Sequence, residues 1–311
     1  MHATAIDTAP AAGTWPRSDR DAPGARETEH GDPLLWHTIG LETMASLLVV
    51  SLRRQGSHFF AARCQWPRLH PLNERTATVR HHPLIMAEST RQLATALEHT
   101  YLPGAGTAPL EPVSVSMGTP PRTQPAESGS ATEVAVRVGV SDLVRREGGA
   151  LVAYRVTAEY LHAGAPFGSC TMRFARRAQS APAGEHPAVP PALLHPAAAA
   201  VGAAAEHDVL VARAPQGRLV VVPRDPAHPV LLPGRPSRLP TLALLEAGRQ
   251  AALLNCGRTA GAVAGLGIDL RAPVPARGAR LEVAADPGGF RFLVMVAGRV
   301  GATGTVALPR S

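Results

Sequence analysis

One short pattern, E-x-x-R-Q, occurs twice in this chain of 311 residues and constrains its fold more than any other feature. Both copies lie in apolar segments whose spacing predicts helices, over 82–101 and 240–258. The first copy is Glu88, Arg91 and Gln92, and the second, 158 residues further along, is Glu246, Arg249 and Gln250. A pattern repeated at the same place in two similar helices indicates a duplicated structural unit.

Each copy places an acid, a guanidinium and an amide on one face of its helix, because they stand at i, i+3 and i+4. An ionised carboxylate among apolar side chains is costly unless it has a partner. One interpretation is a structural ion pair. The other gives the glutamate an acid, base or orienting role and the arginine an anion-binding role. The residues alone leave both interpretations open.

Extended segments with alternating or apolar patterns surround each helix. Before the first helix they are 45–52 and 58–65, predicted to form a hairpin, and after it they are 132–140, 150–160 and 168–176. Around the second helix they are 209–212, 218–223, 280–284, 290–297 and 301–308. The two halves therefore have a similar plan of one helix and several antiparallel strands.

Composition sets the predicted domain boundaries. We expect a disordered tail over 1–33, a first domain over 34–178, a surface linker rich in Ala and Pro over 179–206, and a second domain over 207–311. The N-terminal residues lack the basic start and apolar run of a secretory signal, and the longest apolar stretches are too short to cross a bilayer. A cytoplasmic protein without a membrane partner is the expectation.

The net charge of +7 says little about partners, because all 31 basic residues are arginine and they are spread along the chain. No block of like charges resembles a nucleic-acid-binding arm, so we expect no nucleic-acid partner. The three cysteines, Cys64, Cys170 and Cys256, form no C-x-x-C pair, and no histidine spacing is typical of a metal site. No metal and no cofactor are predicted.

Two stretches of the first half carry a family resemblance. Residues 65–71, QWPRLHP, and 81–92, HHPLIMAESTRQ, resemble the Q-W-P-R-x-H-P and H-D-P-L-L-x-A-E-x-x-R-Q segments of the AfsA family of γ-butyrolactone biosynthesis proteins. In the second half, 207–210 (HDVL), 227–230 (AHPV) and 244–252 (LLEAGRQAA) are similar to that family's D-V-L-L, H-P and L-L-E-A-x-R-Q-A-A. The resemblance extends over about residues 34–311.

The resemblance implies an α+β tandem hotdog fold, in which each half wraps an antiparallel sheet around one central helix. It also implies an acyltransferase that joins a β-ketoacyl chain to a hydroxyl of dihydroxyacetone phosphate. The donor would be a thioester on acyl carrier protein or coenzyme A, and the product a precursor of a γ-butyrolactone signal. Two alternatives stand beside it: a degenerate paralogue that binds acyl chains without turnover, and a hotdog thioesterase or dehydratase. A homodimer is left open.

By the same resemblance, the catalytic candidates are Glu88, Arg91, Glu246 and Arg249, and the substrate-binding candidates are Gln92, Gln250, Arg68, His70, His81 and Trp66. A glutamate would take the proton of the attacking hydroxyl, an arginine (Arg91, Arg249 or Arg68) would hold the phosphate, and amides at a helix start would stabilise the thioester oxyanion. The family's D-H-P-x-D-H-V-P-G-M is replaced here by residues 233–242, which contain no Asp or His. Glu88 is therefore expected to be the main catalytic glutamate, and Glu246 is expected to have a structural or supporting role.

Overall fold

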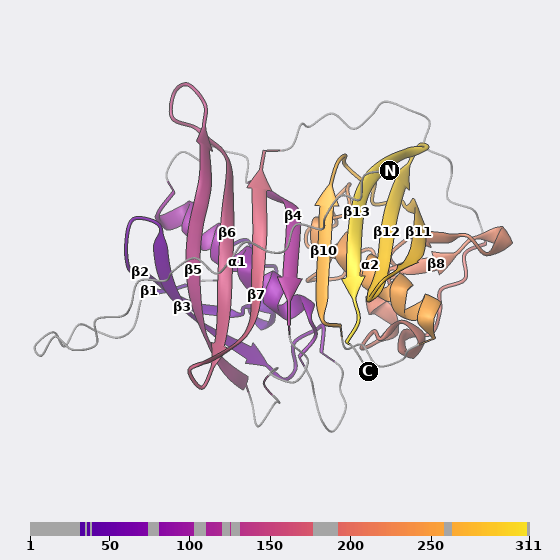
Figure 1. Cartoon of the computed structure of the whole chain (residues 1–311), viewed down its shortest axis with the longest axis horizontal. Coiled ribbons are helices and arrows are strands. Elements are labelled where there is room, and N and C mark those ends of the chain that lie inside the picture. Colours follow the sequence, from indigo (N-terminus) through magenta and orange to yellow (C-terminus); the bar gives the residue numbers. More distant parts are fainter. Residues whose placement is uncertain are drawn as a thin grey trace, which may run out of the picture. The chain divides into compact units, whose positions relative to one another are not determined.

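A single antiparallel sheet of thirteen strands forms the body of the protein. The computed structural model describes residues 32–34, 36–37, 39–73, 81–102, 110–119, 125, 131–176, 192–257 and 263–309. Residues 31–311 form one compact unit, and the tail predicted over 1–33 lies outside the described residues except for its last two positions. Figure 1 shows the strands of the two halves lying next to each other in the sheet.

The first half contains β1 (Asp32–Pro33), β2 (Val49–Arg54), β3 (Phe59–Pro67), α1 (Leu84–Thr100), β4 (Glu111–Gly118), β5 (Ala131–Arg145), β6 (Leu151–His162) and β7 (Ala165–Ala175). The second contains β8 (Val211–Arg213), β9 (Leu219–Val221), α2 (Thr241–Cys256), β10 (Gly265–Leu270), β11 (Ala279–Asp286), β12 (Gly289–Val296) and β13 (Arg299–Ala307). Short 3-10 helices, η1 (Met44–Ser46), η2 (Ala198–Val201), η3 (Glu206–Asp208) and η4 (Pro215–Gly217), connect them.

The two halves repeat the same topology. From β2 to β7 and from β8 to β13 the chain runs through two strands, one helix and four strands. Outward from the middle of the sheet, the strand order is β4-β7-β6-β5-β3-β2 on one side and β10-β13-β12-β11-β9-β8 on the other. This correspondence supports the duplication inferred from the repeated motif, and the expected α+β architecture is confirmed.

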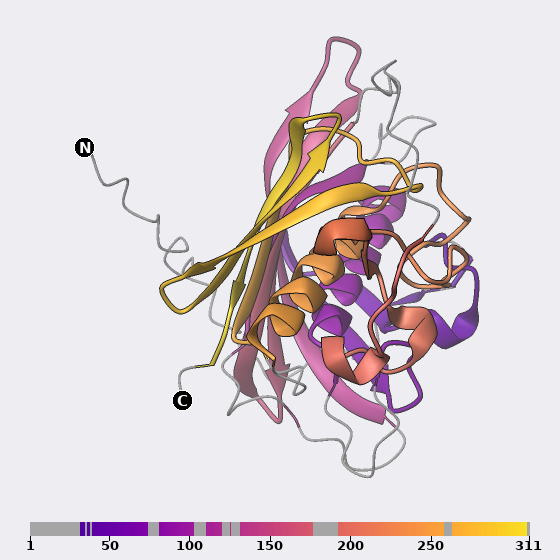
Figure 2. The ribbon, with the colours of Figure 1, turned by 90° about the vertical axis from the view of Figure 1, so that its right-hand side faces the viewer.

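Both helices pack on the same face of the sheet, as Figure 2 shows. They are buried on nearly all sides by the hydrophobic core, which explains why their sequences are apolar around the whole circumference. Helix α2 ends at Gly257, whose φ of +65° is the left-handed conformation that glycine adopts at little cost. Within the described part of the chain, no helix combines the length and apolar character required to span a bilayer.

The sequence pattern missed β1, whose two residues were assigned to the disordered tail but pair with β2 at the edge of the sheet. It also missed β4 and β10, which pair with each other and join the halves. Strand β4 contains Pro112 and two serines, and β10 contains Gly265 and Gly267, so each includes residue types that disfavour strands. A side chain at Gly265 would crowd the carbonyl of Met117 on β4. The glycine therefore permits the close pairing of β4 with β10.

The segment expected to be a surface linker is partly built into the fold. Its described residues, 192–206, include η2, in which Ala198 and Val201 are buried, and Leu194, which forms a β-bridge with Arg213. Residues 177–191 lie outside the described residues. Small alanine side chains pack without a long apolar pattern, which is why composition alone indicated a linker here. The domain boundaries at 178 and 207 stay a prediction.

Candidate functional site

Both copies of the repeated motif form a buried glutamate–arginine pair. Arg91 donates to Glu88 with Nε at 2.8 Å and Nη2 at 2.6 Å, and Arg249 donates to Glu246 at 2.7 and 2.6 Å. Each pair is bidentate, the strong geometry for guanidinium and carboxylate. The pairs differ in solvent access: the Arg91 side chain is 24% exposed, whereas that of Arg249 is 0% exposed and also donates to the Gly202 carbonyl.

The motif glutamines attach each helix to an extended segment. Gln92 donates through Nε2 to the Ser46 carbonyl at 2.8 Å and accepts from the Leu48 amide at 2.9 Å. Gln250 does the same with the Asp208 carbonyl and the Leu210 amide, both at 2.8 Å. Each glutamine also donates to its own motif glutamate. These contacts use both ends of the amide, so neither glutamine is placed to bind a substrate.

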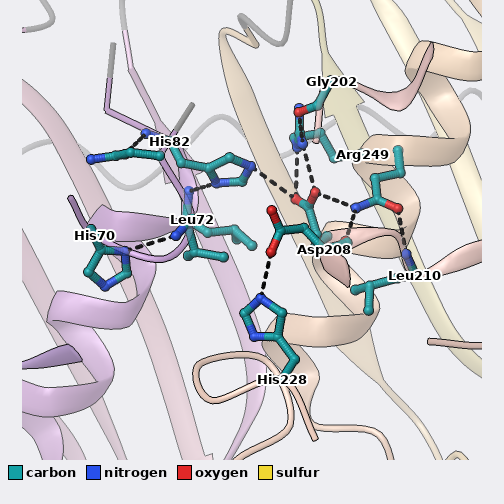
Figure 3. Close-up of polar contacts among 12 residues, drawn as sticks. His70, Leu72, His82, Gly202, Asp208, Leu210, His228 and Arg249 are labelled. Atoms are coloured by element: carbon teal, nitrogen blue, oxygen red, sulfur yellow. Dashed lines mark hydrogen bonds and ion pairs between the residues drawn. The ribbon is translucent and has the colours of Figure 1, made fainter. Parts of the chain in front are cut away.

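One contact crosses from the first half to the second. Nε2 of His82, just before α1, lies 3.6 Å from Oε2 of Glu246 on α2, and both side chains are less than 10% exposed (Figure 3). Burial by itself raises the pKa of Glu246, but the charge of Arg249 and then that of His82, together with the hydrogen bonds from Arg249, hold the pKa well below its ordinary value. Glu246 is therefore ionised and is a weak proton acceptor. Among the described residues, no histidine forms an ion pair with Glu88.

The orientation of the His82 ring is fixed by the backbone. Its Nδ1 accepts a hydrogen bond from the Leu84 amide at 3.2 Å, so in the neutral ring the proton is on Nε2, which faces Glu246. The 3.6 Å separation is an ion-pair contact but exceeds hydrogen-bond length, so this proton is not committed to the carboxylate. His82 thus presents a fixed donor at the junction of the two halves.

A second imidazole–carboxylate contact lies beside this pair, within the second half. His228 Nε2 lies 2.9 Å from Asp208 Oδ1, and His228 Nδ1 accepts from the Val230 and Leu231 amides at 3.1 and 3.0 Å. Both ring nitrogens are therefore used. In Figure 3, Asp208 lies between His228 and Arg249 of α2. This contact fixes the segment before β8 and leaves no ring nitrogen for a substrate.

Two predicted substrate-binding residues, Trp66 and His81, lie together with His82 around a cavity of about 10 Å³ at the start of α1. Trp66 donates to the Ser89 hydroxyl at 3.0 Å, and the ring nitrogens of His81 contact Asn73 and Thr132. Burial, with a smaller effect of His162, lowers the pKa of His81 to about 4. The cavity is large enough for one water molecule or one substrate oxygen atom.

His70 and Arg68 follow β3 and differ in burial. His70 is 2% exposed and its Nδ1 accepts from the Leu72 amide at 3.3 Å, whereas Arg68 is exposed on the turn before it. Burial, followed by the charges of His82, His81 and His228, lowers the pKa of His70 to about 3. His70 is therefore a neutral ring near the junction.

The site also contains residues that were not among the predicted ones, namely Ser46, His82, Asp208 and His228. Three of them, His82, Asp208 and His228, stand in the family-like segments 81–92, 207–210 and 227–230. Their place in those segments is the sequence signal that could have identified them as site residues. Within the described ranges, no group of three or more His, Cys, Asp or Glu side chains is arranged to hold a metal ion.

A comparison with known protein families finds a match in the first half of the chain. Residues 37–176 match the family model described as the A-factor biosynthesis hotdog domain, AfsA. A search of curated proteins finds no match. Similar solved structures include the dehydratase domain from the terminal module of the rifamycin polyketide synthase, with 15% identity over 88% of this chain and 99% of that one and a TM-score of 0.46.

Two further structures show a comparable degree of likeness. An acyl-ACP thioesterase from Bacteroides thetaiotaomicron is 7% identical over 80% of this chain and 97% of that one, with a TM-score of 0.46. HtdX from Mycobacterium tuberculosis is 17% identical over 73% and 86%, with a TM-score of 0.40. These likenesses are too low to carry an argument. The family match and the repeated topology confirm the hotdog fold.

Proposed function

We propose, from the premise that residues 37–176 are an AfsA hotdog domain, that this chain is an acyltransferase acting on acyl thioesters. In full, it joins a β-ketoacyl chain, delivered on acyl carrier protein or coenzyme A, to a hydroxyl of dihydroxyacetone phosphate in γ-butyrolactone signal biosynthesis. The observation that carries the proposal is the His82–Glu246 contact between the halves. It places a fixed N–H donor beside a buried carboxylate. Such a donor can stabilise the negative charge that develops on a thioester carbonyl oxygen.

In this proposal His82 is the catalytic residue. Its Nε2–H donates a hydrogen bond to the thioester carbonyl oxygen as negative charge develops there during attack by the hydroxyl. The C–O bond of the ester forms, the C–S bond breaks, and the departing thiolate takes up the proton that the hydroxyl loses, so the second product is the free thiol of the carrier. Glu246 is a positioning residue, because its carboxylate orients the ring so that Nε2–H faces the junction. This differs from the prediction that a glutamate takes the hydroxyl proton, since the low pKa of Glu246 makes it a poor base.

In this proposal, Arg68 binds the phosphate group of dihydroxyacetone phosphate. Of the three candidate arginines, Arg91 and Arg249 are bound in bidentate fashion to the motif glutamates, and Arg249 has no exposed surface. Moving either arginine to a phosphate would leave a buried carboxylate without its partner, at a cost of about 3–5 kcal/mol. Arg68 is exposed and stands two residues before His70.

The test is an assay of the purified chain with a β-ketoacyl thioester, with and without dihydroxyacetone phosphate, read by mass spectrometry of the ester. We expect His82→Ala to lower kcat by about a hundredfold, the usual loss for one such donor. His82→Gln, which retains an N–H donor, should recover part of that rate. Glu246→Gln should lower kcat more than it changes KM for the thioester.

Glu88→Gln is the matched control, because it alters the same motif at an acid that no histidine of the described ranges pairs with. If Glu88→Gln abolishes the reaction while His82→Ala does not, the reaction belongs to the first motif, as the sequence predicted. Melting temperatures of all variants separate lost chemistry from lost folding.

A thioesterase is the second candidate, and the commitment of Arg91 and Arg249 to carboxylates favours it. It would release free β-keto acid from the thioester at the same rate whether or not the triose phosphate is present. Ester formed only with the triose phosphate supports the acyltransferase, and free acid formed in both cases supports the thioesterase.

A further inference from the structure

A groove of about 470 Å³ lies where β4 and β7 of the first half meet the residue before β10 of the second. Its size is within the usual range of ligand pockets. It is lined by Gly118, Thr119, Glu159, Pro166, Phe167, Gly168, Ser169 and Ala264. Pro166 and Ser169 are exposed, so a ligand can enter the groove from solvent.

The groove shares a wall with the small cavity beside His82. Thr119 and Phe167 line both hollows, and both residues are buried. Gly168 of the groove approaches Met86 of the cavity so closely that a methyl group at position 168 would lie 2.9 Å from Met86 Sδ. A single layer of residues therefore separates the groove from the cavity.

The two shared residues are held in different ways. The Thr119 amide donates to the Ala264 carbonyl at 3.0 Å, which fixes Thr119 to the second half. The Phe167 ring contacts the rings of Trp66 and Tyr160, with centroids 5.6 and 6.3 Å away. Turning an aromatic ring breaks no hydrogen bond, so the Phe167 side chain is the part of the wall that can move.

The chemistry of the lining fits a neutral chain that contains amides. The Ser169 hydroxyl can donate to or accept from an amide, and Pro166 supplies apolar surface. Glu159, whose carboxylate accepts from Arg137 at 3.0 Å, disfavours a phosphate in the groove. The cavity beside His82 holds one oxygen atom, so the rest of a thioester bound there must lie outside it.

We propose that the groove binds the pantetheine arm of the acyl donor, and that the thioester reaches His82 past the Phe167 ring. The inference rests on the proposed function and adds to it a binding site for the donor. A pantetheine arm is a neutral chain with two amides, and it carries the acyl group in both coenzyme A and acyl carrier protein. It must run inward from the surface, because the carrier stays outside, and the groove offers such a path.

The test compares the binding of two thioesters of the same 3-oxooctanoyl group by calorimetry. One is the pantetheine thioester, and the other is the N-acetylcysteamine thioester, which ends after the first amide of the arm. We expect the wild type to bind the pantetheine thioester about tenfold more tightly, the effect of about one hydrogen bond. Ser169→Trp, which fills the groove, should reduce this preference to less than twofold. Ser141→Trp, at an exposed serine of β5 outside the groove, is the matched control and should retain the preference.

The source of the arm and the path past Phe167 have their own measurements. KM is measured for the coenzyme A thioester and for the carrier-protein thioester, and a rise of about tenfold in Ser169→Trp with one donor only identifies that donor as the source. Phe167→Leu should increase the association rate constant of the pantetheine thioester in stopped flow, because a smaller side chain obstructs the path less. An unchanged rate constant would overturn the path.

If Ser169→Trp does not fold, Ala264→Phe, which fills the groove from the second half, decides in its place. A preference retained in the folded variant overturns the inference, as does a wild type that binds both thioesters equally, and either result leaves the proposed function standing. A groove-dependent preference in a protein that forms no ester with the triose phosphate overturns the proposed function alone. Failure to bind either thioester overturns both.

Discussion

His70 and His81 show how burial decides the chemistry of a residue in this protein. Their side chains are 2% and 5% exposed, and burial is the largest cause of their lowered pKa values, about 3 and about 4. Both rings accept a hydrogen bond at Nδ1, from the Leu72 amide and the Asn73 side chain. An imidazole used in this way cannot take up a proton without losing a contact.

Stability should therefore fall on mild acidification. Below the ordinary pKa of 6.5, both histidines are protonated in the unfolded chain but not in the folded chain. The free energy of unfolding therefore decreases as the pH falls. Between pH 7 and pH 5 we expect a loss of about 2 kcal/mol per histidine. Glu246, whose folded pKa is lowered, adds a loss in the same direction only below about its ordinary 4.5.

The measurement is the free energy of unfolding in denaturant at pH 7 and pH 5. His81→Gln should remove about 2 kcal/mol of the difference, its own share by the same linkage. His58→Gln, at an exposed histidine, is the control and should leave the difference unchanged. A His81→Gln chain with the wild-type pH dependence would contradict the account.

The two helices pack against their strands by different means at equivalent positions. Thr90 on α1 contacts Tyr160 on β6 through hydroxyls 2.7 Å apart, and Thr90 also donates to the Met86 carbonyl. On α2 the same motif position is Gly248, and a methyl group there would overlap the ring of Phe292 on β12. A small residue on the helix thus accommodates a large one on the strand.

Gly248→Ala should destabilise the protein although alanine is the better helix former. The gain in helix propensity is about 1 kcal/mol, while crowding in a packed core costs typically 1–3 kcal/mol. We expect a net loss of about 1 kcal/mol or more, measured by denaturant unfolding. Gly248→Ala combined with Phe292→Leu should recover most of it, and a single variant as stable as the wild type would show that α2 is free to shift.

At the scale of the whole molecule, β4 and β10 make the two halves one sheet. Their register pairs Ser116 with Gly267, flanked by Met117–Leu266 and Val115–Ile268. The inward side chains of this pairing are buried in the common core. The His82–Glu246 contact depends on this junction, because its two residues belong to different halves.

Ser116→Pro should uncouple the halves, since proline removes a ladder hydrogen bond from the middle of the sheet at a cost of about 3 kcal/mol. All three tryptophans, Trp15, Trp36 and Trp66, precede β4, so fluorescence reports the first half while far-ultraviolet circular dichroism reports both. The two transitions should coincide in the wild type and separate in the variant. Ser116→Thr is the control, and coincident, unshifted transitions in Ser116→Pro would refute the prediction.

The sequence by itself determined the local parts of this protein. The hairpin of β2 and β3, the two buried helices and the glutamate–arginine pairs follow from patterns of a few residues, because a carboxylate in an apolar helix needs a partner within one turn. The motif of α1 also lies in the segment that matches the AfsA hotdog family model. β4 and β10 escaped prediction because their stability comes from pairing with distant strands, not from their residue types.

Only the tertiary structure decided what surrounds each copy of the motif. Glu88 and Glu246 have the same sequence neighbours, yet Glu246 alone of the two meets His82 among the described residues, and Arg249 alone is closed off from solvent. The serine at position 46 could be recognised as the counterpart of Asp208 only through the hydrogen bonds that both halves repeat. These differences arise because contacts between distant residues depend on how the two halves join, which no local pattern encodes.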